Sequence, residues 1–313
     1  MKNAPTGKPA LPERGTDRVA EVAWQLVLVL WGDKYPVREV NHLIDTSQAH
    51  AKPAPARIIL LTDRPRPGLR DEVDARDMPA FFLNPDFLRG GCQAKLCMFE
   101  KGMVPDDLPA LFVDIDTVVL GNLSQHVHLM QDRQTVAILQ IANLPFGALA
   151  RWLYRRTGGR RYSRGNSSVV VYHPAECTHI AARFRELFAR HGSDGFRPMI
   201  ADERFISWVN QPNMRAIPRD MAVKLPTEFM LPWRWLILLR ARLPWVRARW
   251  DRLIVVTLPG VEVKGDALLA LPEGAEIIDR KGRRLIWSEA ALGPIKARLT
   301  DYYRSLDRKG EAS

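Results

Sequence analysis

The fold of this chain is decided by the stretch Leu111-Phe-Val-Asp114-Ile-Asp116-Thr-Val-Val-Leu-Gly121-Asn122-Leu123. Its apolar start predicts a buried β-strand, and the strand leads directly into two aspartates one residue apart. In open α/β sheets, ligands bind beyond the carboxyl ends of the strands. Residues i and i+2 of an extended chain point the same way, so a bend can aim both carboxylates at one Mg²⁺ or Mn²⁺ ion, or one at the ion and one at a sugar hydroxyl. The alternative is a turn in which the acids cap the next element.

The segments on either side of this stretch predict a layered α/β fold. Besides 109–114, apolar runs predict strands at 25–31, 57–62, 135–141 and 168–172. Helical spacing of apolar residues or compatible composition predicts helices at 37–49, 91–101, 177–191 and 289–306. Strands that alternate with helices indicate a largely parallel sheet. No glycine-rich phosphate loop follows a strand, which argues against dinucleotide-dependent enzymes and P-loop proteins.

The composition is that of a basic globular protein. Among 313 residues, 46 Lys and Arg face 35 Asp and Glu, and 46% of residues are hydrophobic, which excludes a disordered, collagen-like or disulfide-dense chain. Three cysteines without metal-finger spacing favour a reducing compartment. The first twenty residues are Pro-rich and polar, and no apolar run reaches the ~20 residues of a membrane span. We therefore expect a cytoplasmic protein with residues 1–20 as a flexible tail.

Two arginine-rich stretches carry much of the excess charge, at 151–164 and 234–252. The second lies within a segment, 229–250, that also holds four tryptophans. Trp prefers the membrane–water boundary and Arg meets anionic headgroups, so we expect peripheral contact with an anionic inner membrane face or a lipid-linked acceptor. The alternatives are a single-stranded nucleic-acid surface and an intramolecular lid. No RNA-binding motif or zinc finger supports the first of these, so no nucleic-acid partner is expected. The 151–164 stretch either extends the 229–250 surface or forms a mobile basic loop over the ligand site.

The segment from Phe112 to Leu123 resembles the "YLDxDxxVxxdl" segment of nucleotide-sugar glycosyltransferases with the GT-A fold. The closest resemblance is to the retaining family that includes glycogenin and bacterial lipopolysaccharide galactosyl- and glucosyltransferases, over about residues 22–210. It implies a Rossmann-like α/β fold with a mixed, mainly parallel sheet flanked by helices. It also implies a catalytic domain at 21–227 and a basic, Trp-rich C-terminal extension at 228–313 packed on that domain.

Four further segments resemble the family's binding segments in the right order. Residues 28–35 resemble the first strand and uracil-binding turn, and 94–99 resemble the basic helix that meets the nucleotide sugar. Residues 165–171 resemble "FNSGVMV", which faces the donor sugar, and 201–206 resemble "DQxxLN", near the anomeric carbon. Each side chain also has a structural interpretation, as a core or surface Tyr, a solvated helix charge, or a turn or helix cap. The implied donor-binding residues are Trp31, Asp33, Tyr35, Lys95, Asp114, Asp116 and Asn166; Asp202 and Glu203 are the implied catalytic residues, and Asp114 and Asp116 the ligands of Mn²⁺ or Mg²⁺.

The sequence departs from the family at three places. Glu203 replaces the usual Gln, and Ser168 replaces a small residue. The family's "HxxGxxKP" supplies a third metal ligand and a phosphate-binding Lys. Its nearest counterpart here, 257–264, lacks the His and spaces Gly and Lys one residue further apart. Lys264 matches the family's phosphate-binding Lys and is the implied diphosphate contact.

The resemblance implies a metal-dependent, retaining transferase that moves a hexose from a nucleoside-diphosphate sugar, UDP-sugar first, to a hydroxyl of a glycan or glycolipid. The absent His motivates an alternative, a catalytically impaired relative that binds nucleotide sugar or membrane. A basic nucleic-acid binder is the third hypothesis.

Overall fold

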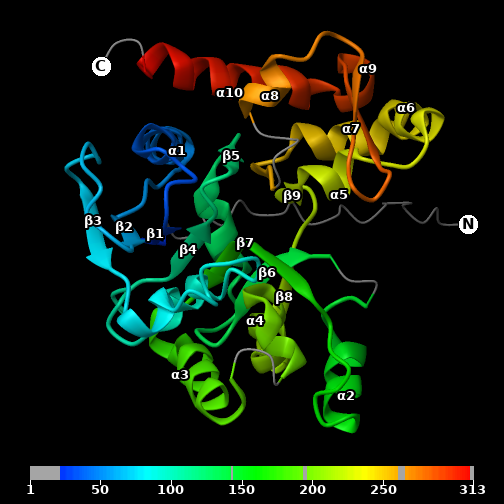
Figure 1. The fold of residues 1–313 in the computed structure, drawn as a ribbon. Coiled ribbons are helices and arrows are strands. Elements are labelled where there is room, and N and C mark those ends of the chain that lie inside the picture. The colour runs from blue at the N-terminus through cyan, green and yellow to red at the C-terminus, as the bar shows by residue number, and fades with distance from the viewer. Residues whose placement is uncertain (1–21, 142–143, 193–195, 260–264, 311–313) are drawn as a thin grey trace, which may run out of the picture.

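The computed structural model describes residues 22–141, 144–192, 196–259 and 265–310. Within these ranges the core is a seven-stranded sheet in the order β3-β2-β1-β4-β7-β6-β8, joined by a three-stranded sheet and a hairpin (Figure 1). The main sheet contains β1 (Gln25–Leu30), β2 (Arg57–Thr62), β3 (Val73–Asp77), β4 (Ala110–Val113), β6 (Val136–Gln140), β7 (Gly165–Tyr172) and β8 (Met214–Ile217). The small sheet contains β5 (Thr117–Val119), β9 (Ala222–Lys224) and β10 (Val255–Thr257); the hairpin is β11 (Ala275–Ile278) and β12 (Arg284–Trp287).

Helices surround these sheets. The α-helices are α1 (Val37–His50), α2 (Ala148–Arg156), α3 (Pro174–His191), α4 (Asp202–Val209), α5 (Leu225–Phe229), α6 (Arg234–Arg242), α7 (Pro244–Asp251), α8 (Gly265–Leu269), α9 (Glu289–Leu292) and α10 (Pro294–Gly310). The 3₁₀ turns are η1 (Ala80–Leu83), η2 (Gln93–Phe99), η3 (Leu123–Leu129), η4 (Arg197–Ile200) and η5 (Gln211–Asn213).

The sheet is mixed and mainly parallel, as predicted. Strands β3, β2, β1 and β4 are parallel, β7 is antiparallel to both neighbours, and β6 runs parallel to β8. Since β7 is reversed, its first residues reach the same edge of the sheet as the last residues of β1 and β4. This edge holds both the two aspartates after β4 and the polar start of β7.

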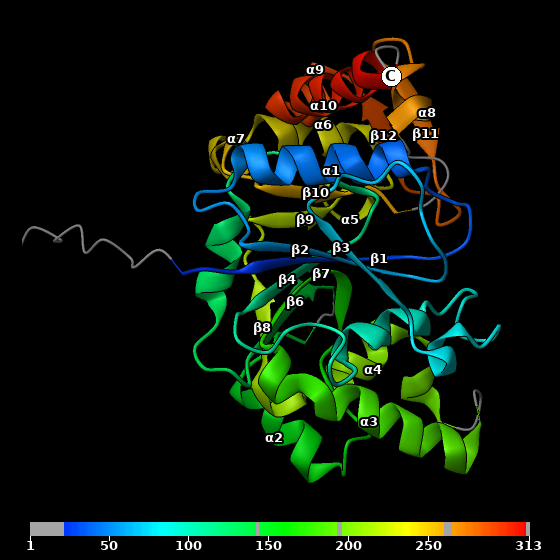
Figure 2. The ribbon, with the colours of Figure 1, turned by 90° about the vertical axis from the view of Figure 1, so that its left-hand side faces the viewer.

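Both faces of the main sheet are buried, which explains why β1 is apolar from Leu26 to Leu30. Val27 and Val29 join the core cluster that holds α3, whereas Leu26, Leu28 and Leu30 join the cluster that holds α1. Figure 2 shows α3 and α4 below the sheet, and α1 above it with the C-terminal helices beyond. Successive side chains of β1 therefore pack alternately against the helices on the two faces of the sheet.

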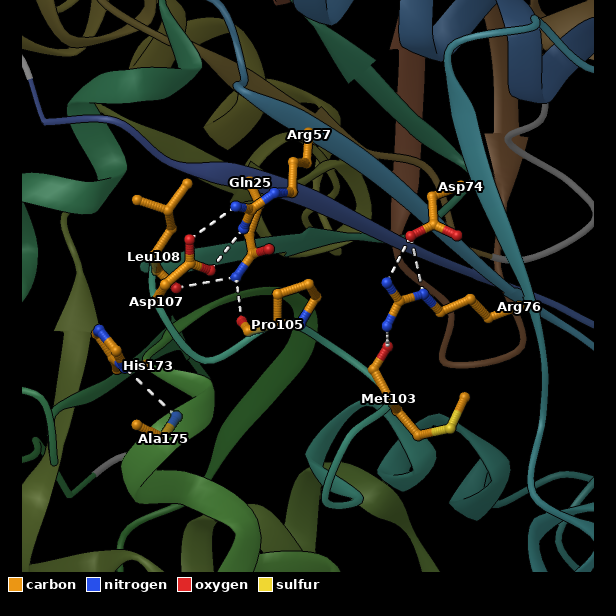
Figure 3. A network of polar contacts seen from close by, with 10 residues as sticks. All are labelled: Gln25, Arg57, Asp74, Arg76, Met103, Pro105, Asp107, Leu108, His173 and Ala175. Carbon is orange, nitrogen blue, oxygen red and sulfur yellow. Dashed lines mark hydrogen bonds and ion pairs between the residues drawn. The ribbon is translucent and has the colours of Figure 1, made fainter.

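A polar network lies at the amino ends of β1 and β2, opposite the carboxyl ends of the strands (Figure 3). The Gln25 side chain donates to the carbonyl oxygens of Pro105 and Leu108, at 2.7 and 2.9 Å. The Arg57 guanidinium binds both carboxylate oxygens of Asp107. These bonds fasten the segment before β4 to the starts of β1 and β2, which leaves the carboxyl ends as the open edge.

Several predicted elements differ in detail. The helix expected at 91–101 is the 3₁₀ turn η2. The helix expected at 289–306 is divided at Gly293, whose φ of +56° favours glycine, and Pro294 begins α10. The edge strand β3 was not expected because its sequence, VDARD, has no apolar run.

The C-terminal part packs on the small sheet. One core cluster combines Val118 and Val223 from the small sheet with Phe229, Trp250 and Trp287. Residues on both sides of position 227 thus share a core; the division into 21–227 and 228–313 stays a prediction, and residues 1–20 lie outside the described residues. Within the described ranges, every helix is too short or too polar to cross a bilayer.

Candidate active site

A cavity of about 490 Å³ opens at the carboxyl edge of the main sheet. Of the predicted site residues, it brings together Trp31, Tyr35, Lys95, Asp114, Asp116, Asn166, Asp202 and Glu203. Asp33 lies outside it, because its carboxylate is 90% exposed and pairs with Arg64. Lys264 lies outside the described residues. The cavity thus collects side chains from segments that are far apart in the sequence.

The two aspartates lie where the chain passes from the main sheet to the small one. Strand β4 ends at Val113 and β5 begins at Thr117. The Asp114 backbone N–H donates to the Ser168 carbonyl at 2.9 Å, and the Asp116 carbonyl accepts from Leu258 N–H at 2.8 Å. The connecting turn is therefore held by both sheets, which fixes the two carboxylates at the cavity.

Each carboxylate has a different partner. Asp114 Oδ1 lies 2.5 Å from Lys95 Nζ, and Tyr35 donates its hydroxyl proton to Asp116 Oδ2 at 3.0 Å. Asp116 Oδ1 is buried and has no hydrogen-bond partner among the described residues. Burial and the neighbouring Asp114 charge raise the pKa of Asp116. A buried carboxylate oxygen without a partner, one residue from a second carboxylate, suits a hard divalent cation.

Lys95 stays charged despite its burial. Burial disfavours the ammonium form, but the carboxylates of Asp114 and Asp202 outweigh that cost and raise the Lys95 pKa. The site therefore keeps a positive charge beside the two aspartates.

The start of β7 is locked to the start of α4. Asn166 Nδ2 donates to Glu203 Oε2, and Ser167 Oγ donates to Asp202 Oδ2, both at 2.6 Å. The β6–β7 register shifts between Ile138 and Leu139, which frees residues 167–169 of β7 from pairing with β6. This irregularity lets consecutive polar side chains of β7 reach α4 and the cavity.

Asp202 is a buried acid at the first residue of α4. Burial raises its pKa to about 6, while the Lys95 charge and the hydrogen bond from Ser167 oppose the shift. Asp202 is thus mostly ionised at neutral pH and becomes protonated in mildly acidic solution.

The loop before η2 forms one wall. A Cβ on Gly91 would lie 2.3 Å from the Ile200 carbonyl oxygen, so only glycine fits there. The next residue, Cys92, has a φ of +53°, which is uncommon for a side chain with a Cβ. The Gly91 carbonyl accepts from Asp202 N–H at 3.0 Å. This close approach brings Lys95 and Asp202 to the same cavity.

Sequence reasoning missed several lining residues: Lys34, Arg89, Ser167 and Lys224. Lys224 ends β9, a strand too short to show an apolar run, although its position at a strand end is the signal that found Asp114. Ser167 lies between Asn166 and Ser168, and a hydroxyl at this position is a possible partner for the carboxylate of Asp202.

The tryptophan–arginine segment 229–250 does not line this cavity. Its Trp233, Trp235 and Trp245 are exposed, whereas Trp250 is buried. Glu228, just before the segment, is buried with ion pairs to Arg219, Arg240 and Arg249 and a 2.9 Å hydrogen bond from Trp250 Nε1. Trp250 and the arginines around Glu228 therefore pack within the protein, as an intramolecular element would, whereas the other three tryptophans face outward.

The architecture is similar to that of solved glycosyltransferases. The galactosyltransferase LgtC, in complex with donor and acceptor sugar analogues, matches with a TM-score of 0.54 and 13% identity over 90% of this chain and 95% of that chain, and an active-site mutant of LgtC matches equally. The bifunctional glycosyltransferase WbbM, in its apo structure, matches with a TM-score of 0.53 and 13% identity over 91% of this chain and 52% of that chain. No protein-family model and no curated protein sequence matches this chain. The likeness confirms the predicted GT-A fold of nucleotide-sugar glycosyltransferases.

Proposed function

We propose that this protein is a metal-dependent, retaining glycosyltransferase that moves a hexose from a UDP-sugar to a hydroxyl of a glycan or glycolipid. The observation that carries the proposal is the convergence, in one cavity at a strand-end edge, of the Asp114–Asp116 pair with Lys95, Asn166 and Asp202. The fold shared with LgtC, which was crystallised with donor and acceptor sugar analogues, supports the same class of reaction.

Asp114 and Asp116 would hold Mn²⁺ or Mg²⁺. The buried Asp116 Oδ1, which lacks a partner among the described residues, is the atom in this structure that best fits such an ion. Tyr35 would orient Asp116 by donating to its other oxygen. When bound, the ion would neutralise negative charge on the diphosphate leaving group.

The protein's own groups would orient the sugar and balance its charge. Lys95 would offset the charge that develops on the departing diphosphate. Asn166 and Glu203, already hydrogen-bonded to each other, would bind sugar hydroxyls. Asp202, ionised at neutral pH, would stabilise positive charge at the anomeric carbon.

The proposal is tested with Asp114→Asn and Asp116→Asn. We expect each to reduce divalent-dependent UDP-sugar turnover by about 10³-fold, as loss of charge stabilisation at a reacting phosphate does. The matched control, Asp301→Asn, removes an exposed carboxylate on α10 and should keep wild-type turnover. Thermal stabilisation of each protein by UDP with and without Mn²⁺ reports binding separately.

Wild-type turnover in both site variants would overturn the proposal. If the wild type binds UDP with Mn²⁺ but neither hydrolyses nor transfers any common donor sugar, the impaired-relative alternative is correct instead. The absent family His is the observation that keeps this alternative open.

The tryptophan–arginine segment would contact an anionic membrane at the inner face. Trp233 and Trp235 are 58% and 62% exposed and stack on each other, with ring centroids 6.3 Å apart. Trp245, ten residues further along the chain, is 68% exposed. Exposed indoles prefer the interfacial region of a bilayer, and Arg242, which is exposed on α6, supplies positive charge. Such a contact would hold the enzyme near a glycolipid acceptor.

A further inference from the structure

A second cavity, of about 790 Å³, lies between the loop after α2, the end of α3 and the helix α4. Among the described residues, its lining contains six arginines and neither Asp nor Glu. Aromatic side chains, Tyr162, Phe196 and Trp208, line it as well. The arginines are Arg160, Arg161, Arg164, Arg183, Arg197 and Arg204.

Most of this charge has no counter-ion among the residues that the structure describes. Among the described residues, Arg183 pairs with Glu186, and the other five form no ion pair. Three of these guanidiniums act on one hydroxyl: burial raises the pKa of Tyr162, while the charges of Arg204, Arg164 and Arg197 oppose the shift. Like charges gathered in this way repel one another, so an anion bound among them would be stabilised strongly.

The cavity wall is fixed by specific contacts. Gly159 has a φ of +79°, and a Cβ there would lie 2.9 Å from the Trp208 indole nitrogen, so glycine allows this loop to approach α4. Further along the loop, Ser163 N–H donates to the Gln211 side chain, and Ser163 Oγ donates to the Leu144 carbonyl. The arginines around Ser163 therefore project from an anchored backbone.

The two cavities are lined by residues of the same two segments, around the start of β7 and the start of α4. Arg164 is two residues from Asn166, and Arg204 follows Glu203 directly. Asn166 and Glu203 line the first cavity and are joined by a 2.6 Å hydrogen bond. An acceptor in the basic cavity would therefore contact the same two segments that carry the groups expected to hold the donor sugar.

We propose that this basic cavity binds the phosphate of a phosphorylated sugar acceptor, so that the enzyme glycosylates sugar phosphates, either soluble or carried on a lipid. This inference rests on the proposed transferase function. Arginine forks match phosphate oxygens in bidentate pairs, and a phosphate monoester carries about −1.5 to −2 charges at neutral pH. The aromatic side chains offer flat surfaces to the sugar ring. A neutral acceptor would itself offer these guanidiniums no counter-ion.

The test measures binding of glucose 6-phosphate and of glucose by calorimetry at constant ionic strength, with the protein saturated with UDP and Mn²⁺. We expect the phosphorylated sugar to bind about tenfold or more tightly than glucose. Arg164→Gln/Arg197→Gln should weaken glucose 6-phosphate binding about tenfold or more, and weaken UDP binding far less. The control, Arg155→Gln/Arg156→Gln, removes two exposed arginines of α2 that do not line the cavity and should bind glucose 6-phosphate as the wild type does.

A second arm identifies the source of the phosphate. Vesicles that contain phosphatidylinositol 4-phosphate are compared with vesicles that contain phosphatidylinositol, using the same variants. A preference for the phosphorylated member in either arm, lost in Arg164→Gln/Arg197→Gln and kept in the control, supports the proposal.

Three results would overturn it: equal binding of the phosphorylated and unphosphorylated members in both arms, an equal loss in the control variant, or tighter binding of a uridine oligonucleotide through the same arginines. The titrations are repeated without UDP. Failure of UDP and Mn²⁺ to bind would refute the proposed function, and the acceptor assignment with it, while binding of glucose 6-phosphate would still reveal whether the cavity is an anion site.

Discussion

The two arginine-rich stretches look alike in the sequence and have opposite environments in the structure. Each holds six arginines, at 151–164 and 234–252. In the second stretch, Arg240 and Arg249 pair with the buried Glu228, Arg234 pairs with Glu276, and Arg252 pairs with Asp220. In the first stretch no arginine forms an ion pair with a described residue. The difference teaches that a run of arginines does not by itself indicate a binding surface, because the fold decides which of its charges meet a carboxylate.

Removing the carboxylate at the centre of the second stretch tests this contrast most strongly. Glu228→Ala should lower the free energy of unfolding by about 3 kcal/mol, measured by urea denaturation, because three guanidiniums and the Trp250 indole lose a buried partner. This loss of stability is near the lower end of the range expected for breaking a buried ion pair, because the three arginines are themselves partly exposed.

The matched control is Asp220→Ala. Asp220 and Arg252 are 3.3 Å apart, with side chains 37% and 61% exposed, so this change should cost under about 1 kcal/mol. Equal effects of the two substitutions would mean that Glu228 does not organise the segment, and the contrast between the stretches would fail.

A buried acid that forms no ion pair with a described arginine sharpens the contrast further. Burial raises the pKa of Asp202 from 3.8 to about 6, so the folded protein holds this proton more tightly than the unfolded chain. The resulting stabilisation is fully present below pH 3.8 and is lost as the pH rises through about 6. Asp202→Asn mimics the protonated form. It should therefore be more stable than the wild type at pH 7.5, by about 1–3 kcal/mol, with the difference vanishing towards pH 4.

Denaturation of both proteins from pH 4 to pH 8 measures this. The same ionisation predicts that wild-type kcat/KM falls as the pH drops below about 6, because the proposed function needs the Asp202 carboxylate. A pH-independent stability difference would show that Asp202 stays ionised throughout.

The sequence could predict those parts of the fold and site that are encoded locally. The buried strand before Asp114 and the acids after it lie in one segment, so both the strand and the cavity edge follow from it. The order of the other segments, taken with the resemblance, was enough to bring Asn166 and Asp202 to the same place. The role of Asp33 stays a prediction, since its exposed carboxylate pairs with Arg64 and does not line the cavity.

Features that depend on distant partners could not be predicted. Nothing near Glu228 in the sequence indicates that arginines from three places converge on it. The basic cavity needs α2, α3 and α4 to be placed before its arginines can be seen to share a volume. Lys224 is the last residue of a three-residue strand with too little apolar sequence to be recognised.

The smallest expected effect concerns the tryptophans of the second stretch, and the first stretch supplies the control. Figure 1 shows α2, which carries Trp152, and α6, which carries Trp235, at opposite ends of the molecule. Trp152 and Trp233 are both 58% exposed, and Trp235 is 62% exposed. Trp233→Ala/Trp235→Ala should weaken binding to vesicles rich in anionic lipid by about tenfold, because less apolar surface enters the interface.

Co-sedimentation with these vesicles measures the effect, and Trp152→Ala should leave binding unchanged. High salt should weaken binding of the wild type, since Arg242 and its neighbours would act through charge. If Trp152→Ala weakens vesicle binding as much as the double substitution, α6 is not the membrane-binding element. The exposed tryptophans of the second stretch would then need another partner, and the two stretches would differ in their internal ion pairs alone.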